Sequence, residues 1–202
     1  MWFSQLKTKL FNMREIDWVE NLKELLIKEL PGESNLIIET KRKLPYACEI
    51  KAYDENWKIK ENKLQLIYFE TDLLIYEKTD LIKPRVVLEA KLKDATTHDT
   101  ITYSQKAFNH KFITPYLRYG LIIGNKKTSL SGKLFRHGQN FDFIFKTNGY
   151  ELSKSELEEL TCLVKKEVEI SRQIERIAYE SKSRNKEGYD VLVRNLKTKS
   201  LN

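Results

Sequence analysis

The sequence predicts an α/β (α+β) protein, in which a mixed central sheet is flanked by helices and followed by a long C-terminal helix. Three features favour this class. Two strand-like apolar runs on either side of a polar turn predict a hairpin over 68–93. A strand, a helix and a second strand follow one another over 86–124. Apolar residues recur at helical spacing over 16–30 and again over 153–181.

The N-terminal third supplies one helix and the first strands. Apolar residues from Ile16 to Leu30 recur at helical spacing, and Pro31-Gly32 ends that pattern. Two short strands are expected at Asn35–Thr40 and Tyr46–Tyr53. A third, Leu64–Phe69, leads into the 68–93 hairpin.

A crossover helix is expected between Asp94 and Tyr116, followed by a strand at Tyr119–Gly124. Thr97 or Asp99 would cap the helix, and Pro115 would stop it. One helical stripe, expected to face the sheet, comprises Ile101, Ser104, Phe108 and Phe112.

The remaining elements lie C-terminal to this core. Lys133–His137 and Phe141–Phe145 are expected to form a second hairpin. A long helix should run from about Ser153 to Ser181, because Ser153 precedes Glu156 at capping-box spacing. Its apolar side would pack on the sheet or on a partner subunit, and it includes Leu160, Leu163, Val164, Ile170, Ile174 and Ile177.

The hairpin is expected to gather three charged residues at one end. If Tyr76 faces Arg85, then Asp72 lies opposite Glu89, and directly opposed residues share a face. Lys91 points the same way as Glu89, because strand side chains alternate faces. Two carboxylates beside an ammonium group are expected of a divalent-metal site with an activated water.

A solvated edge of the sheet is the alternative, since an acid and a lysine two residues apart are common on exposed strands. Apolar runs adjoin both acids, namely Leu73-Leu74-Ile75 and Val86-Val87-Leu88. Such runs indicate strands that are covered on both faces. Charges at the ends of buried strands cost free energy unless they are paired or metal-bound, and an ion pair would use only one of the acids.

Residues 64–124 resemble the PD-(D/E)XK nuclease superfamily, the fold of many restriction endonucleases and repair nucleases. The resemblance rests on Asp72, the hairpin, and three apolar residues followed by Glu89, Ala90 and Lys91; Thr71 stands where the family has a proline. It implies that Asp72, Glu89 and the carbonyl of Ala90 bind magnesium. It also implies that Lys91 orients or deprotonates the attacking water.

Further residues are candidates for the same site. Several members of the superfamily carry a glutamine on the crossover helix, and Gln105 holds a similar position, expected to face the sheet. A surface glutamine is the ordinary alternative. Glu70 shares the parity of Asp72, and Glu20 or Glu24 on the first helix would be an additional acid.

Composition fits a compact cytosolic enzyme. The 202 residues suit a core over 1–150, with 151–202 adding the long helix and a basic tail to the same domain. Cys48 and Cys162 have no metal-ligand spacing and are expected to be reduced thiols. No apolar run approaches the roughly 20 residues that span a bilayer, so no membrane contact is expected.

The charge favours a nucleic-acid partner. The net charge is +7, and the last 22 residues hold six basic side chains against two acidic ones. A basic tail suits phosphate contacts with DNA, although a solvated C-terminus would look the same. The three histidines have no zinc-site spacing, and no G-x-S-x-G or G-x-G-x-x-G motif occurs.

The sequence therefore leads to the hypothesis of a magnesium-dependent endonuclease that hydrolyses DNA phosphodiester bonds, with Mn²⁺ as a substitute ion. Lys91, beside the ion, would have a lowered pKa. A type II restriction-type enzyme is favoured, and a homodimer would supply two active sites for two strands. The alternatives are a repair or mobile-element nuclease of the same fold, and a nucleic-acid-binding protein that retained the fold without activity.

Overall fold

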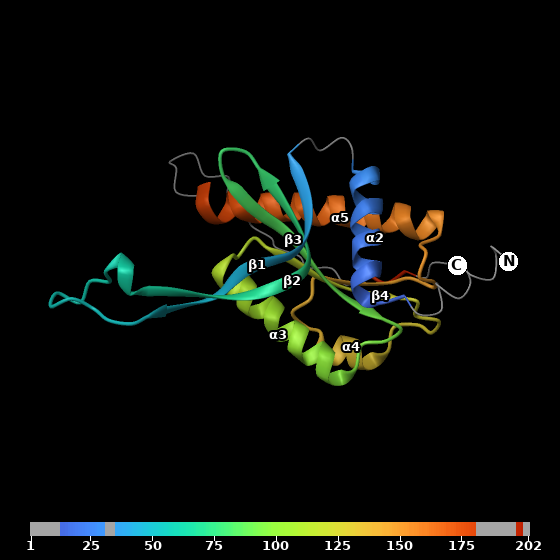
Figure 1. Cartoon of the computed structure of the whole chain (residues 1–202), viewed down its shortest axis with the longest axis horizontal. Helices are drawn as coiled ribbons and strands as arrows, with labels where there is room; N and C mark the ends of the chain where they lie inside the picture. The colour runs from blue at the N-terminus through green and yellow to red at the C-terminus, as the bar shows by residue number, and fades with distance from the viewer. Residues whose placement is uncertain (1–12, 31–34, 181–196, 200–202) are drawn as a thin grey trace.

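The computed structural model describes residues 13–30, 35–180 and 197–199 (Figure 1). Strands and helices alternate along most of the chain. In order they are α2 (Glu15–Glu29), β1 (Leu36–Ile50), the 3-10 turn η1 (Glu61–Lys63), β2 (Leu64–Lys78), β3 (Ile82–Leu92), α3 (Thr97–Ile113), β4 (Arg118–Gly124), α4 (Gly132–His137), β5 (Phe143–Lys146), α5 (Lys154–Glu175) and the π-helical turn η2 (Arg176–Glu180).

The five strands form one mixed sheet in the order β1-β2-β3-β4-β5. β1, β2 and β3 are antiparallel neighbours, whereas β3, β4 and β5 run parallel to one another. Parallel neighbours need a crossover connection, and α3 provides it between β3 and β4. The predicted mixed α/β class with a long C-terminal helix is confirmed.

Helices cover both faces of the sheet. α2 and α5 pack on one face, and α3 and α4 lie on the other (Figure 1). The first core joins Trp18, Leu22 and Leu26 of α2 and Leu160, Val164 and Val168 of α5 to the strand residues Ile38, Leu73, Ile75, Val86, Leu88, Ala90 and Ile122. Because alternate strand residues point to opposite faces, Leu74, Val87, Tyr119 and Leu121 fill the second side.

The β2–β3 hairpin contains a bulge, so its predicted register is only partly right. Leu73 pairs with Leu88, in the register expected, but Tyr76 pairs with Pro84 and not with Arg85. Proline has no amide hydrogen for the ladder and is tolerated at bulges. The pairing of Tyr76 with Arg85 is therefore wrong. The shift lies on the loop side of Ile75, and the register towards Asp72 is unaffected.

The bulge leaves Arg85 free to form a buried ion-pair network. Its Nε lies 2.7 Å from Glu77 Oε2, and its Nη1 lies 2.7 Å from Glu175 at the end of α5. Arg172 Nε donates to the other Glu77 oxygen over 2.7 Å. Although burial alone would raise the pKa of Glu77, the two guanidinium groups hold it below its ordinary value. This network ties the hairpin to α5.

The helix boundaries follow their capping residues. α2 and α5 lie where the sequence predicted them, and Ser153 caps α5 through the expected capping box with Glu156. α3 is capped by Thr96, whose side chain accepts from the Asp99 amide, so the cap precedes the predicted Thr97 by one residue. Pro115 follows the end of α3 as expected.

Two predicted segments have a different structure. The strands expected at Asn35–Thr40 and Tyr46–Tyr53 belong largely to one continuous strand, β1, which is bulged between Pro45 and Ala47. Lys133–His137 is not a strand but most of α4, because Leu134 is buried against β4 and Gly138 follows the helix end. Phe143–Lys146 then pairs parallel to β4, so there is no second hairpin here.

Of the stripe predicted to face the sheet from α3, Ser104 is buried as expected, but the three large apolar residues Ile101, Phe108 and Phe112 are exposed. Small and polar residues pack towards the sheet instead, namely Thr100, Ser104, Ala107 and His110. Phe112 is 77% exposed, and Ile101 and Phe108 are about half exposed. Side-chain size explains the error, since small residues let α3 lie close to β1, where His110 contacts the rings of Tyr46 and Phe69.

The outer parts of β1 and β2 extend beyond the body of the protein as a two-stranded arm, drawn in cyan at the left of Figure 1. The arm comprises residues 45–68 and continues the ladder as far as the pair Ile50–Leu64. Its tip contains η1 and an isolated bridge between Tyr53 and Ile59.

Most of the predicted basic tail lies outside the described residues. Of its basic side chains, Lys197 and Lys199 are described, and Lys199 pairs with Glu159 of α5 over 2.5 Å. The part of the chain that the structure describes contains no helix long and apolar enough to cross a membrane.

Candidate active site

Asp72 and Glu89 lie next to each other at the end of the β2–β3 ladder, as the sequence predicted. The last pair of the ladder is Leu73–Leu88, and each carboxylate belongs to the next residue along its strand. Asp72 Oδ2 accepts a hydrogen bond of 2.8 Å from the amide of Ala90. One carboxylate is therefore fixed to the strand that carries the other.

Glu89 is almost completely buried, with 1% of its surface exposed. The Tyr119 hydroxyl donates to its Oε1 over 2.6 Å, and Lys106 Nζ of α3 lies 3.6 Å from its Oε2. Burial and, to a smaller extent, the negative charge of Asp72 raise the pKa of Glu89 to about 7. The positive charge of Lys106 lowers this pKa, but by less than Asp72 raises it. Two carboxylates this close are destabilised as a pair unless a cation joins them.

Lys91 follows on the same strand and is held by α2. Its Nζ lies 3.3 Å from Glu15 Oε1, while Glu15 Oε2 accepts from the Leu92 amide over 3.1 Å. The ammonium group also lies 5.4 Å from the centre of the Tyr103 ring. Burial disfavours the charged amine, but Tyr103 and Glu15 outweigh it and raise the pKa of Lys91. The lowered pKa that the sequence predicted for Lys91 beside a bound cation stays a prediction.

A cleft of about 280 Å³ opens beside Asp72, between α2 and the strands β1 and β2. Four acidic side chains contribute to its wall, and they are Glu15, Glu20, Glu70 and Asp72. Ile16, Val19, Thr40 and Lys41 complete the lining. The cleft therefore has an acidic wall, and the partly buried Asp72 is the member of the carboxylate pair that borders it.

The candidate acids on the neighbouring elements differ in position. Glu70 and Glu20 line the cleft, as the sequence suggested, and Glu20 Oε1 accepts from the Thr40 hydroxyl over 2.5 Å. Lys23 also binds Glu20, and these interactions lower the pKa of its carboxyl group. Glu24, the other candidate on α2, is exposed and does not line the cleft.

Gln105 does not face the sheet, contrary to the prediction. It is exposed, and its Nε2 donates to Asn109 one turn further along α3. Because Ser104 and Ala107 occupy the buried side, the site-facing position on this helix belongs to Lys106, which also lies over the rings of Phe69 and Tyr103. The proposed role of Gln105 at the reacting centre has no geometric support.

Three contributors were not predicted. Glu15 lies in the first turn of α2, Lys106 adjoins Gln105, and Tyr119 opens the apolar run of β4. The acidic residues at the start of α2 were visible in the sequence. They did not indicate a site, because acids are common in first turns for reasons of the helix dipole alone. No sequence signal distinguished Tyr119 from an ordinary core tyrosine.

The donor chemistry fits a hard divalent cation. Asp72, Glu89 and the carbonyl of Ala90 offer oxygen ligands, and Mg²⁺ is commonly held by one or two carboxylates while waters and substrate phosphates fill its other positions. Within residues 13–30, 35–180 and 197–199, no group of three or more His, Cys, Asp or Glu side chains is arranged to hold a metal ion. The three oxygen ligands from Asp72, Glu89 and Ala90 would by themselves leave open positions around an octahedral ion.

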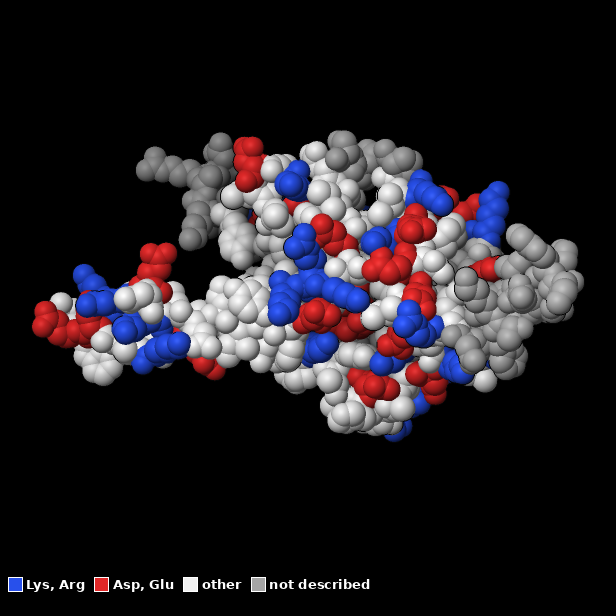
Figure 2. Space-filling model, viewed as in Figure 1, with Lys and Arg blue, Asp and Glu red and all other residues white. Residues whose placement is uncertain are grey.

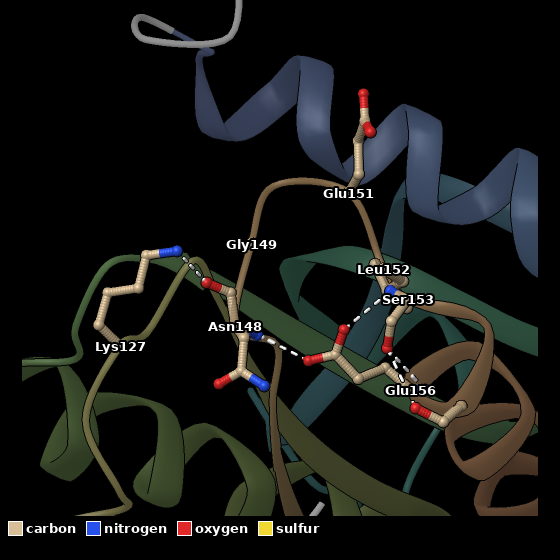
Figure 3. Close-up of a pocket in the computed structure, with 8 residues that line it drawn as sticks. Lys127, Asn148, Gly149, Glu151, Leu152, Ser153 and Glu156 are labelled. Carbon is tan, nitrogen blue, oxygen red and sulfur yellow. Dashed lines mark hydrogen bonds between the residues drawn. The ribbon is translucent and has the colours of Figure 1, made fainter. Parts of the chain in front are cut away.

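A second, larger hollow of about 550 Å³ lies at the start of α5 (Figure 3). Its polar groups already serve the backbone. Glu156 accepts from the amides of Asn148 and Ser153 over 2.7 and 2.8 Å, and Lys127 donates to the carbonyl of Asn148. Although burial opposes it, this hydrogen bonding lowers the pKa of Glu156. The hollow is a helix cap and not a second candidate for the active site.

Comparison with family models and curated proteins assigns this chain to no family. The chain matches no protein-family model and no curated protein.

Proposed function

We propose that this protein is a magnesium-dependent endonuclease that hydrolyses phosphodiester bonds in DNA, and that it is a type II restriction-type enzyme. The observation that carries the proposal is the adjacency of Asp72 and Glu89, with Lys91 on the same strand and an acidic cleft beside them. The net charge of +7 is compatible with a polyanionic substrate.

The two carboxylates and the Ala90 carbonyl would hold the ion. When bound, Mg²⁺ lowers the pKa of a water ligand and neutralises charge on the phosphate. The hydrogen bond from the Ala90 amide keeps Asp72 in place as a ligand. The hydrogen bond from Tyr119 orients Glu89, whose burial excludes bulk water from that side of the site.

Two lysines supply positive charge at the reacting centre. Lys91 would orient the attacking water or take its proton. The ion pair with Glu15 holds the Lys91 side chain in position. Lys106 Nζ lies 3.6 Å from Glu89 and would help to balance charge on the phosphodiester. Mn²⁺ also prefers oxygen ligands and should substitute for Mg²⁺.

The test is cleavage of plasmid DNA by the full chain in Mg²⁺, in Mn²⁺ and in EDTA. Asp72→Ala and Glu89→Ala should abolish cleavage, and Lys91→Ala should slow it by about 10²–10⁴-fold. Glu24→Ala, which changes an exposed acid on α2 outside the cleft, should cleave at the parental rate. Discrete fragments would support a restriction-type enzyme, and a smear would indicate a nonspecific nuclease.

Two results would contradict the mechanism. Cleavage by Lys91→Ala at the parental rate would remove the proposed role of the lysine. Salt-dependent DNA binding without cleavage in either ion would favour the alternative of a nucleic-acid-binding protein that retained the fold.

A further inference from the structure

The arm formed by residues 45–68 ends in a turn that exposes an aromatic surface. Trp57 is 81% exposed, and its ring contacts that of Tyr53, with 5.7 Å between the two centroids. Tyr53 also forms an isolated bridge with Ile59, so these two side chains share one face of the ribbon. We name Tyr53, Trp57 and Ile59 the apolar tip. All three are exposed, and no core cluster of the described residues includes them.

Trp57 has a backbone conformation that favours glycine. Its φ is 60°, in the left-handed region that bulky side chains rarely adopt. Asp54 holds the turn in this conformation, because its Oδ1 accepts from the amides of Asn56 and Lys58, each over 2.9 Å. The Asp54 carbonyl also accepts from the Trp57 amide over 3.1 Å. Glycine would adopt this conformation without strain. Strained residues cluster at functional sites, and Trp57 is therefore a candidate contact residue.

Four lysines adjoin the apolar tip, and all four are exposed. Lys58 and Lys60 belong to the strand that leaves the turn. The Lys51 amide donates to the Lys63 carbonyl across the ribbon over 2.9 Å. Acidic side chains lie among them, but the carboxylate of Asp54 is engaged by the turn. An apolar surface bordered by long cationic side chains suits a nucleic acid, whose bases lie between phosphates.

Basic side chains also connect the arm to the candidate active site. Lys41, Arg42 and Lys43 are exposed on β1. Arg42 pairs with Thr71, so this segment lies beside the part of β2 that carries Asp72. In Figure 2, Lys and Arg side chains lie where the arm meets the body and again towards its tip, with acidic side chains among them. A polyanion that occupied the active site would therefore meet further positive charge along the arm.

The arm is long enough to reach DNA about one helical turn from the active site. β2 carries Asp72 and continues into the arm as far as Leu64, eight residues away, which corresponds to about 26 Å of strand (Figure 1). The three residues from Ile50, the partner of Leu64, to Tyr53 add about 10 Å. The apolar tip therefore lies roughly 35 Å from Asp72 along the ribbon. One turn of B-DNA spans about 34–36 Å.

We propose that the arm lies in the major groove of the same duplex that the active site cleaves, and that the apolar tip contacts base edges about one helical turn from the cleaved bond. The inference rests on the proposed function, which supplies the DNA partner. The major groove is about 12 Å wide and admits a two-stranded β-ribbon. Apolar side chains contact the thymine methyl group there, and the lysines of the arm contact the phosphates on either side.

The test replaces Trp57 with residues that suit its backbone conformation. Glycine and asparagine both tolerate a positive φ, so Trp57→Gly and Trp57→Asn should keep the parental midpoint of urea unfolding. Leu81→Gly is the matched control, because it removes an apolar side chain that is 68% exposed in the β2–β3 loop.

Binding of the full chain to a labelled duplex of about 30 bp, close to three helical turns, is measured by fluorescence anisotropy in EDTA, so that no cleavage occurs. Both Trp57 variants should bind this duplex about tenfold more weakly than the parent and Leu81→Gly do, because each loses a contact with the bases. On a duplex of about 10 bp, which is too short to cover the active site and the apolar tip together, this difference should largely disappear.

Fluorescence quenching reports the same contact locally. Acrylamide should quench the exposed Trp57 ring in the free protein, and the longer duplex should protect it. The difference between the parent and Trp57→Gly isolates this signal from the other tryptophans.

Three results would overturn the inference. They are Trp57 variants that bind the longer duplex as tightly as Leu81→Gly, an equal loss of affinity on both duplexes, and a Trp57 ring that stays open to acrylamide when DNA is bound. Protection of Trp57 without DNA, increasing with protein concentration, would overturn it too and show that the tip packs against protein. If the parent cleaves plasmid DNA in Mg²⁺ and one of these results is found, the inference alone fails. If the parent neither binds nor cleaves DNA, the proposed function fails with it.

Discussion

Replacing Glu89 with glutamine should stabilise the metal-free fold, and more so at pH 8 than at pH 5. Burial, together with the charge of Asp72, raises the pKa of Glu89 from 4.5 to about 7. Between these two values the folded state binds more protons than the unfolded state, so stability falls as pH rises through this window. The amide cannot ionise, and the variant escapes this loss.

The magnitude follows from the two pKa values. The difference between the folded-state and unfolded-state pKa of Glu89 lowers the free energy of unfolding by about 3 kcal/mol at pH 8 and by about 1 kcal/mol at pH 5, relative to acidic pH. Any packing cost of the amide is the same at both pH values. The difference of about 2 kcal/mol between the two pH values is therefore the quantity to measure.

Urea unfolding in EDTA at the two pH values provides the measurement, followed by tryptophan fluorescence from buried Trp18. Glu24→Gln removes an exposed carboxylate from α2 and serves as the control, with no expected dependence on pH. Mg²⁺ should then stabilise the parent at pH 8 more than it stabilises Glu89→Gln. An equal effect of Glu89→Gln at pH 5 and pH 8 would refute the reasoning.

Two further predictions concern stability. Burial, with the charge of Lys106, lowers the pKa of His110 to about 4, so its contribution to stability is present above pH 6.5 and is lost as pH falls towards 4. Between pH 7 and pH 5 the parent should lose about 2 kcal/mol of stability through His110, and His110→Phe should not show this loss. Thermal unfolding at the two pH values would detect the difference. Gly120→Ala would place a Cβ 2.3 Å from the ring of Phe143. It should cost about 1–3 kcal/mol in urea unfolding, and an unchanged midpoint would show that the ring moves aside without cost.

Strand alternation and local register were enough to predict the centre of the candidate site. Asp72 and Glu89 lie on one hairpin, so period-two patterning determines which side chains can meet. The bulge did not spoil this result because its extra residue, Arg85, lies beyond Ile75 on the loop side. Local spacing also predicted the capping box of α5, because Ser153 precedes Glu156 by three residues.

Contacts between elements distant in the sequence were not predictable in this way. Glu15 and Lys106 reach the site from α2 and α3, and their positions depend on how each helix rotates against the sheet. For α3 the larger apolar residues suggested the wrong rotation, because Ser104 and Ala107 allow closer packing than Phe108. The error placed Gln105 where Lys106 lies.

The bulge in the β2–β3 hairpin lies between the hairpin loop and the end of the ladder that carries Asp72 and Glu89. Changes in the length of the loop therefore need not alter the positions of the two carboxylates. The loop residues Thr79–Leu81 connect strands whose pairing changes register before it reaches the carboxylates. A one-residue insertion or deletion in that loop can be absorbed where Arg85 already stands outside the ladder. Loop length can therefore drift among descendants of this chain while the spacing of Asp72 and Glu89 is inherited unchanged.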